Sequence, residues 1–147
     1  MGKRVLVVDD HLPVVKLIEE RLTREGFEVF TAQNGAECLR TVAAERPDLV
    51  ILDLEMPIMD GLRALRALRL KPATSYLPVI ILTVHKDKPD LIAGWMAGAD
   101  EYLTKPCRME DLVAAVKRVL AAPTYHDAEP TPPGLVEVPV DAAATRS

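Results

Sequence analysis

The chain alternates between short runs of aliphatic residues and longer segments in which apolar residues recur at helical spacing. Three runs, at residues 5–8, 49–52 and 79–82, show no polar alternation, which is typical of strands covered on both faces in a parallel sheet. Strands are predicted at residues 4–8, 27–32, 49–52, 78–83 and 102–104, and each is followed by a predicted helix. The second strand mixes polar and apolar residues, as an edge strand does. The pattern predicts an α/β domain with helices on both faces of one sheet.

The helical segments are predicted from Pro13 to a stop at Gly26, and at residues 36–45, 62–70, 88–97 and 108–121. The core face of the first helix is assigned to Val14, Val15, Leu17, Ile18 and Leu22. The helix at 62–70 carries Arg63, Arg66 and Arg69 opposite its leucines, which predicts a solvated face, with a contact for an acidic partner as the alternative. Gly94 lies inside the helix at 88–97, where glycine costs about 1 kcal/mol relative to alanine. We therefore expect this helix to be the least stable.

The character of the chain changes near its end. Five of the twelve prolines lie in the last 25 residues, among Ala, Thr, Glu and Asp. Such a composition predicts disorder, so we expect one domain over residues 3–122 and a disordered proline-rich tail or linker over residues 123–147. An alternating piece at residues 135–140 leaves open the addition of a strand to a sheet edge.

Composition and charge narrow the class of protein. The chain has 147 residues, of which 49% are hydrophobic and 27% charged, enough for one globular domain with a core. No apolar run approaches the roughly 18 residues of a membrane span, and the N-terminus enters a strand directly, so we expect a cytoplasmic protein without membrane contact. A net charge of −4 argues against direct binding of nucleic acid. Cys38 and Cys107 fit a reducing compartment, and Cys107, near a helix N-terminus, is a weaker candidate for a reactive thiol.

The main candidate for chemistry is Asp53, directly after the buried strand at 49–52. In open α/β sheets, ligands gather beyond the carboxyl ends of the strands, so a carboxylate there is suited to chemistry rather than to folding. Met56-Pro57 ends the strand, and Asp60-Gly61 supplies a turn and a helix N-cap. A short loop is therefore expected to lie over Asp53.

Further polar residues end the other strands. Asp9 and Asp10 follow the first strand, and if that strand is central, they meet Asp53 in one small mouth. Three crowded carboxylates suit Mg²⁺, a hard cation that is held by a few carboxylates together with phosphate oxygens. Thr83 and Lys105 end the fourth and fifth strands, where a hydroxyl and an ammonium can bind a phosphoryl group carried by Asp53.

In this order and at these strand ends, the residues resemble the response-regulator receiver domain of bacterial two-component signalling, in its single-domain, chemotaxis-regulator-like form. The resemblance covers about residues 3–122 and rests on Asp9-Asp10, Asp53 with Met56-Pro57 and Asp60-Gly61, Thr83, and Lys105-Pro106. It implies a flavodoxin-like, doubly wound sheet of five parallel strands in the order 2-1-3-4-5.

The resemblance also implies roles for these residues. Asp53 would accept a phosphoryl group from a sensor histidine kinase or a phosphotransfer protein. Mg²⁺ would be bound by Asp9, Asp10, Asp53 and the backbone carbonyl of Glu55, and Thr83 and Lys105 would hold the phosphoryl oxygens.

A switch is implied as well. Thr83 would move inward on phosphorylation and Tyr102 would turn in behind it, with plain packing as the alternative role of Tyr102. The surface of the fourth helix, fifth strand and fifth helix would then bind an unidentified effector or a second copy, so that the protein is a monomer or a phosphorylation-dependent dimer. In relatives the Lys105-Pro106 bond is cis.

The sequence departs from the pattern of the family at two residues near the site. Val84 follows Thr83 where many receivers have alanine, and Glu55 adds an acid at the mouth, so both should alter the rates of phosphorylation and dephosphorylation.

The alternatives to a phosphoacceptor switch with at most slow self-dephosphorylation are a pseudo-receiver that only binds partners and a Mg²⁺-dependent phosphohydrolase. His11 and His85 are interpreted as solvated loop residues. A tail of 25 residues is too short for an output domain, which leaves a stand-alone receiver or a piece of a longer regulator.

Overall fold

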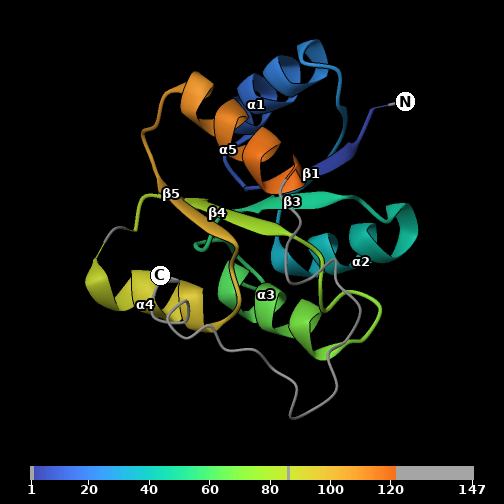
Figure 1. The fold of residues 1–147 in the computed structure, drawn as a ribbon. Coiled ribbons are helices and arrows are strands. Elements are labelled where there is room, and N and C mark those ends of the chain that lie inside the picture. The colour runs from blue at the N-terminus through green and yellow to red at the C-terminus, as the bar shows by residue number, and fades with distance from the viewer. Residues whose placement is uncertain (1, 86, 122–147) are drawn as a thin grey trace.

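The computed structural model describes residues 2–85 and 87–121, and its centre is one parallel sheet (Figure 1). The strands are β1 (Arg4–Val8), β2 (Glu28–Ala32), β3 (Leu49–Leu52), β4 (Val79–Thr83) and β5 (Glu101–Thr104). They pair in the order β2-β1-β3-β4-β5, which confirms the predicted flavodoxin-like topology. β2 is an edge strand, as its mixed composition predicted.

The helices α1 (Leu12–Arg24), α2 (Gly35–Glu45), α3 (Gly61–Leu70), α4 (Lys88–Met96) and α5 (Met109–Ala121) alternate with the strands. α1 and α5 cover one face of the sheet, and α2, α3 and α4 cover the other (Figure 1). Each face has its own core, because side chains of a strand alternate between the two faces. Leu6 and Val8 pack on the side of α2 and α3, whereas Val5 and Val7 pack on the side of α1 and α5. All four residues of β3 are buried, as its unbroken aliphatic run indicated.

The ends of the elements lie within two residues of the predicted ones, and local capping sets several of them. The Asp60 carboxylate accepts a hydrogen bond from the Arg63 N–H at 2.9 Å and begins α3, as predicted. The Asn34 side chain accepts one from the Glu37 N–H at 2.8 Å and begins α2. Both caps direct the chain away from the carboxyl edge of the sheet, where the loops after β1 and β3 are left to form a mouth.

The first helix differs from its predicted face at one residue. Val15, Ile18 and Leu22 form the buried stripe of α1, but Leu17 is 59% exposed, so the assignment of Leu17 to the core is wrong. The three buried residues follow the spacing of one helix face, and Leu17 lies to the side of it.

The arginine face of α3 is divided. Arg63 and Arg66 are exposed as expected, but the side chain of Arg69 is only 15% exposed. Its guanidinium donates to the carbonyl oxygens of Gly98 and Leu77, each at 2.8 Å, and lies 3.3 Å from the Asp100 carboxylate. The largely buried side chain of Arg69 thus connects α3 to the start of β4 and to the turn before β5.

The predicted tail at residues 123–147 lies outside the described residues. Among the helices of residues 2–85 and 87–121, none combines the length and the apolar character that a membrane span needs.

Candidate functional site

The register of the sheet brings the predicted site residues together at its carboxyl edge. Val8 pairs with Leu52, so Asp9 and Asp53, the next residue in each strand, lie side by side. Their backbone N–H groups donate to the carbonyls of Ala32 and Val8, which fixes both residues as extensions of the sheet. The predicted juxtaposition of Asp9 with Asp53 follows directly from β1 being the neighbour of β3.

Asp10 completes a group of three carboxylates. Oxygen atoms of Asp9, Asp10 and Asp53 all lie within 4.8 Å of one another. Asp9 and Asp53 are buried, whereas Asp10 is exposed at the mouth. Like charges at this separation repel one another unless a cation lies among them. The donor set of carboxylate oxygens with one side open to solvent fits a hard divalent cation such as Mg²⁺, which keeps several of its waters.

Lys105 supplies a positive charge within the site. Its ammonium lies 2.7 Å from Asp9 Oδ2 and 3.7 Å from Asp53 Oδ2. The Lys105–Pro106 peptide bond that follows is cis. The ammonium is therefore within reach of any anionic group that is attached to Asp53.

Burial raises the pKa of the Asp53 carboxyl, and the negative charge of Asp9 adds to this effect. A hydrogen bond with Thr83, the charge of Lys105 and the N–H of Glu55 act in the opposite direction but do not cancel it. Thr83 is fully buried at the end of β4, directly beside the carboxylate. A cation at the mouth would favour the ionised form of Asp53, which is the nucleophilic form.

Above these groups lies an open pocket of about 360 Å³. Val84, which is 55% exposed, stands at its rim, so the predicted bulk beside Thr83 faces the entrance. The lining residues are Asp9, Asp10, His11, Asp53, Glu55, Met56, Pro57, Val84 and Lys105.

His85 is a partly exposed residue of the loop after β4, and its side chain also makes two specific contacts. Its Nε2 lies 3.1 Å from a Glu55 carboxylate oxygen, and its Nδ1 lies 3.2 Å from Asp90 on α4. The imidazole thus bridges the loop after β3 and the start of α4. No sequence signal connects residues 55, 85 and 90, because the contact depends on how two loops meet.

We expect the pKa of His85 to lie above the usual value of about 6.5 for histidine. Partial burial lowers the pKa, but the hydrogen bond and charge of Glu55, followed by the charge of Asp90, raise it by more. The stabilising effect of the bridge is then present below the unfolded-state pKa and lost as the pH rises through the folded-state pKa. An NMR titration of the imidazole should show a downward shift of the midpoint in Glu55→Gln and in Asp90→Asn. The remote control Glu28→Gln should keep the wild-type midpoint, and an unchanged midpoint in all three variants would contradict the bridge.

Tyr102 is connected to the same loop. Its hydroxyl donates a hydrogen bond of 2.8 Å to the backbone carbonyl of His85. The ring also packs against the core on the side of α2 and α3. Tyr102 thereby connects β5 to the loop that carries His85.

Cys107 and Cys38 do not have the features of reactive thiols. Burial, and then the charge of Asp111, raise the pKa of Cys107, so the predicted lowering by a helix N-terminus is not seen. Burial raises the pKa of Cys38 to about 12.

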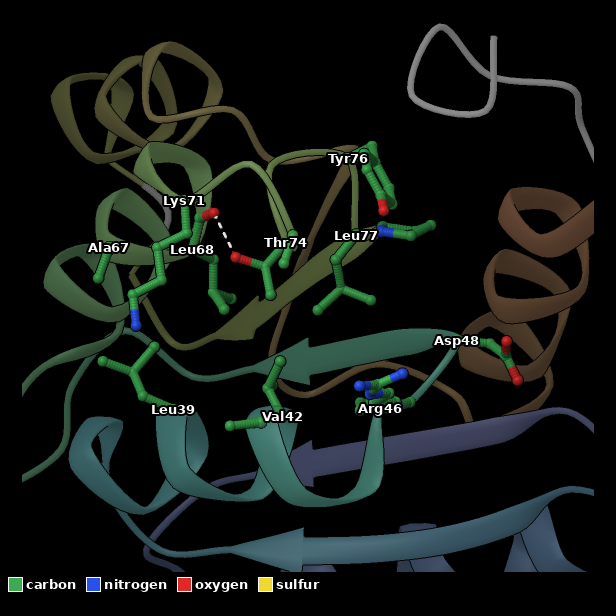
Figure 2. Close-up of a pocket in the computed structure, with 14 residues that line it drawn as sticks. Leu39, Val42, Arg46, Asp48, Ala67, Leu68, Lys71, Thr74, Tyr76 and Leu77 are labelled. Carbon is green, nitrogen blue, oxygen red and sulfur yellow. Dashed lines mark hydrogen bonds between the residues drawn. The ribbon is translucent and has the colours of Figure 1, made fainter. Parts of the chain in front are cut away.

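A larger cleft of about 650 Å³ lies between α2 and the connection from α3 to β4, as Figure 2 shows. Its lining is mostly apolar, with Leu39 and Val42 of α2 on one side, Leu77 on the opposite side, and Lys71 and Arg46 toward its two ends. Thr74 donates a hydrogen bond of 2.7 Å to the Leu68 carbonyl in its wall. Because Asp48 and Pro78 directly precede β3 and β4, this cleft is at the amino end of the strands, away from Asp53.

Comparison with known proteins identifies the family and the fold. The family model of the response regulator receiver domain matches residues 5–117, which include the three carboxylates of the site and all of the sheet except Arg4. The chain belongs to this family. Proteins of this family are phosphoacceptor switches rather than turnover enzymes, and they bind Mg²⁺ in the acidic pocket.

Curated relatives of this receiver domain are transcriptional regulators. The transcriptional regulatory protein PrrA of Mycobacterium tuberculosis is 45% identical over 117 residues, which are 80% of this chain and 49% of PrrA. The alkaline phosphatase synthesis transcriptional regulatory protein PhoP of Bacillus subtilis is 38% identical over 120 residues, or 82% of this chain and 49% of PhoP. The chain thus spans about half the length of the curated relatives that it matches.

Solved receiver structures share the fold over almost their whole length. A CheY-like receiver domain protein of Methanospirillum hungatei has a TM-score of 0.77 at 28% identity, and the match covers 82% of this chain and 94% of the other. The receiver domain of a Francisella response regulator has a TM-score of 0.76 at 30% identity, with 81% and 97% covered.

Proposed function

We propose that this receiver domain accepts a phosphoryl group on Asp53 from the phosphohistidine of a sensor histidine kinase or a phosphotransfer protein in the cytoplasm. The observation that carries the proposal is the convergence on Asp53 of one ammonium, two further carboxylates and one hydroxyl beneath an open pocket. Structural aspartates do not need such surroundings, whereas an aspartate that reacts with phosphorus does.

The transfer follows from the groups around Asp53. An oxygen of the Asp53 carboxylate forms the new bond to phosphorus while the bond from phosphorus to the histidine nitrogen breaks, and the electron pair of that bond stays on the imidazole. Lys105, 3.7 Å from Asp53 Oδ2, and the Thr83 hydroxyl are within reach of the transferred oxygens and would hold them. The open pocket would admit the imidazole of a donor protein.

Mg²⁺ is the proposed cofactor, held by the carboxylates of Asp9, Asp10 and Asp53 and by the Glu55 backbone carbonyl. When bound, it would neutralise the charge that builds up on the phosphoryl oxygens during transfer. The burial of Asp9 and Asp53 and the exposure of Asp10 support this assignment, because they leave one side of the group open to water and phosphate.

The proposed output surface consists of α4, β5 and α5. Ile92 and Trp95 on α4 are half-exposed, and Met96 is 82% exposed, so the helix presents apolar side chains to a partner. Thr83 and Tyr102 would couple Asp53 to this surface, since phosphoryl contacts favour one of two arrangements. The partner would be an effector protein or a second copy of the chain. Self-dephosphorylation would be slow at most.

Intact-mass spectrometry after incubation with acetyl phosphate tests the proposal. The wild-type protein should gain one phosphoryl group in the presence of Mg²⁺ and none in the presence of excess EDTA. The reason is that three carboxylates around the acceptor repel an anionic donor unless a dication offsets their charge. A folded protein that forms no adduct with Mg²⁺ would contradict the proposal and favour the pseudo-receiver.

A further inference from the structure

Gly94 is the one buried residue of α4, and it lies in the interior of the helix, where glycine is, apart from proline, the least favourable residue. The surroundings of Gly94 explain why a larger residue is unfavourable at this position. A Cβ atom at this position would lie 2.9 Å from Ile81 Cδ1, 2.9 Å from Tyr102 Cε2 and 3.0 Å from Tyr102 Cδ2. Carbon atoms in contact are normally about 3.5 to 4.0 Å apart. Alanine at residue 94 therefore does not fit unless a neighbour moves.

Of the two neighbours, the Tyr102 ring is the one with room to move. Ile81 is fully buried in β4, inside the core shared with α2 and α3, where close packing leaves no free volume. Tyr102 lies on the edge strand β5, beside Ile81 in the register of the sheet, and is partly exposed. A side chain at residue 94 would therefore displace the ring outward or lift α4 from β5.

The ring that touches Gly94 is held at its other end by the loop above the carboxylate site. The Tyr102 hydroxyl donates to the His85 carbonyl at 2.8 Å, and the His85 N–H lies 3.4 Å from the Thr83 hydroxyl oxygen. Thr83 ends β4, the strand next to β3, and Asp53 directly follows β3. Neighbouring groups thus connect the strand end at Asp53, through Thr83, His85 and Tyr102, to Gly94.

We propose that Gly94 is a positioning residue, whose missing side chain makes the space in which the Tyr102 ring lies beneath α4 with its hydroxyl on the His85 carbonyl. The link from this ring position to signalling rests on the proposed function. The ring position itself does not, because the clearance at Gly94 exists without any phosphoryl group. Gly94→Ala should accordingly move Tyr102 while leaving Asp53 competent to react.

A purely structural role for Gly94 gives a different expectation. If the glycine served only the packing of α4 on Ile81, shortening Ile81 would relieve the clash. Ile81→Val removes Cδ1, the Ile81 atom nearest to the added Cβ, and leaves both close contacts with the Tyr102 ring. The double variant Ile81→Val with Gly94→Ala therefore separates the two roles.

The test uses the full chain with ¹³C-labelled tyrosine and aromatic NMR spectra, in which Tyr102→Phe assigns the ring. Gly94→Ala should shift the Tyr102 ring signals toward those of free tyrosine, and the shift should persist in the double variant. Ile92→Ala, at an exposed position of the same helix, should leave the signals unchanged. Unchanged Tyr102 signals in Gly94→Ala, or signals restored in the double variant, would overturn the proposal.

A second measurement connects the ring to the output surface. Trp95, the only tryptophan of the chain, follows Gly94 on the exposed side of α4. Wild type and Gly94→Ala should both form the Asp53 adduct with acetyl phosphate, but only wild type should change its Trp95 emission on phosphorylation. An equal emission change in both would overturn the coupling role. If wild type formed no adduct, the proposed function would fail, while the NMR comparison would still decide the position of Tyr102.

Discussion

Asp53→Asn should form no phosphoryl adduct with either acetyl phosphate or a phosphorylated histidine kinase. The amide has no anionic oxygen to form the bond to phosphorus, and the substitution also removes one of the three carboxylates around the proposed cation. Asp9 does not substitute for it, because its carboxylate is paired with Lys105 at 2.7 Å. We expect the rate to fall at least about 1000-fold, which corresponds to about 4 kcal/mol of transition-state stabilisation. Intact-mass spectrometry against time measures this rate.

A matched control is available in the same loop. Asp60→Asn makes the same chemical change at an exposed residue, and asparagine is as good an N-cap as aspartate, so α3 and the adduct should both persist. Circular dichroism should report folded protein for both variants. An adduct of wild-type yield in Asp53→Asn, or peptide mapping of the phosphoryl group to Asp9 or Asp10, would refute the assignment of the acceptor.

Arg69→Met should lower the free energy of unfolding by about 3 kcal/mol, since it removes one partner of a largely buried ion pair together with its hydrogen bonds. The carbonyl oxygens of Gly98 and Leu77 and the carboxylate of Asp100 all lose their cationic donor. Methionine follows the path of the aliphatic stem, so little apolar contact is lost. For a domain of this size the melting temperature should fall by roughly 10 °C.

Urea denaturation followed by circular dichroism measures the effect on Arg69→Met, with Arg66→Met as its control. Arg66 lies on the same helix but is exposed, and its replacement should change stability by no more than about 0.5 kcal/mol. Equal stabilities for the two variants would show that the contacts of Arg69 contribute nothing net. The measurement thereby shows whether Arg69 contributes more to stability than Arg66, although both belong to the same row of arginines in the sequence.

The sequence predicted the sheet well because the amino-acid composition of the strands indicates that they are buried. The unbroken aliphatic runs of β1, β3 and β4 leave little choice but a sheet covered on both faces, and Gly and Pro residues fix most element ends. The strand order required the resemblance to the family, since hydrophobic periodicity does not say which strands are neighbours. Leu17 and Arg69 were misassigned because helical periodicity gives the side of a helix and not what packs against that side.

The candidate site was predictable to the extent that its residues end strands. Asp9, Asp53, Thr83 and Lys105 needed only the rule that carboxyl ends of parallel strands share an edge. The bridge of His85 with Glu55 and Asp90 was not predictable, since it depends on the meeting of two loops. For Gly94 the sequence predicts only a weaker helix, because it does not reveal that Tyr102 and Ile81 occupy the space beside this residue.

The two ends of the strands carry different kinds of polar contact. At the amino ends, Asp48 accepts the Arg4 N–H at 2.7 Å, Asp100 accepts the Val79 N–H at 2.8 Å, and the Arg4 guanidinium pairs with Glu28 and Glu45. At the carboxyl ends, acids are crowded together around Lys105. β1 has five residues at about 3.3 Å each, so these two edges lie roughly 16 Å apart, about twice the screening length of charges in physiological salt. Hydrogen bonds and ion pairs therefore tie the strands together at their amino ends, and a change of charge at Asp53 would act mainly on the carboxyl ends.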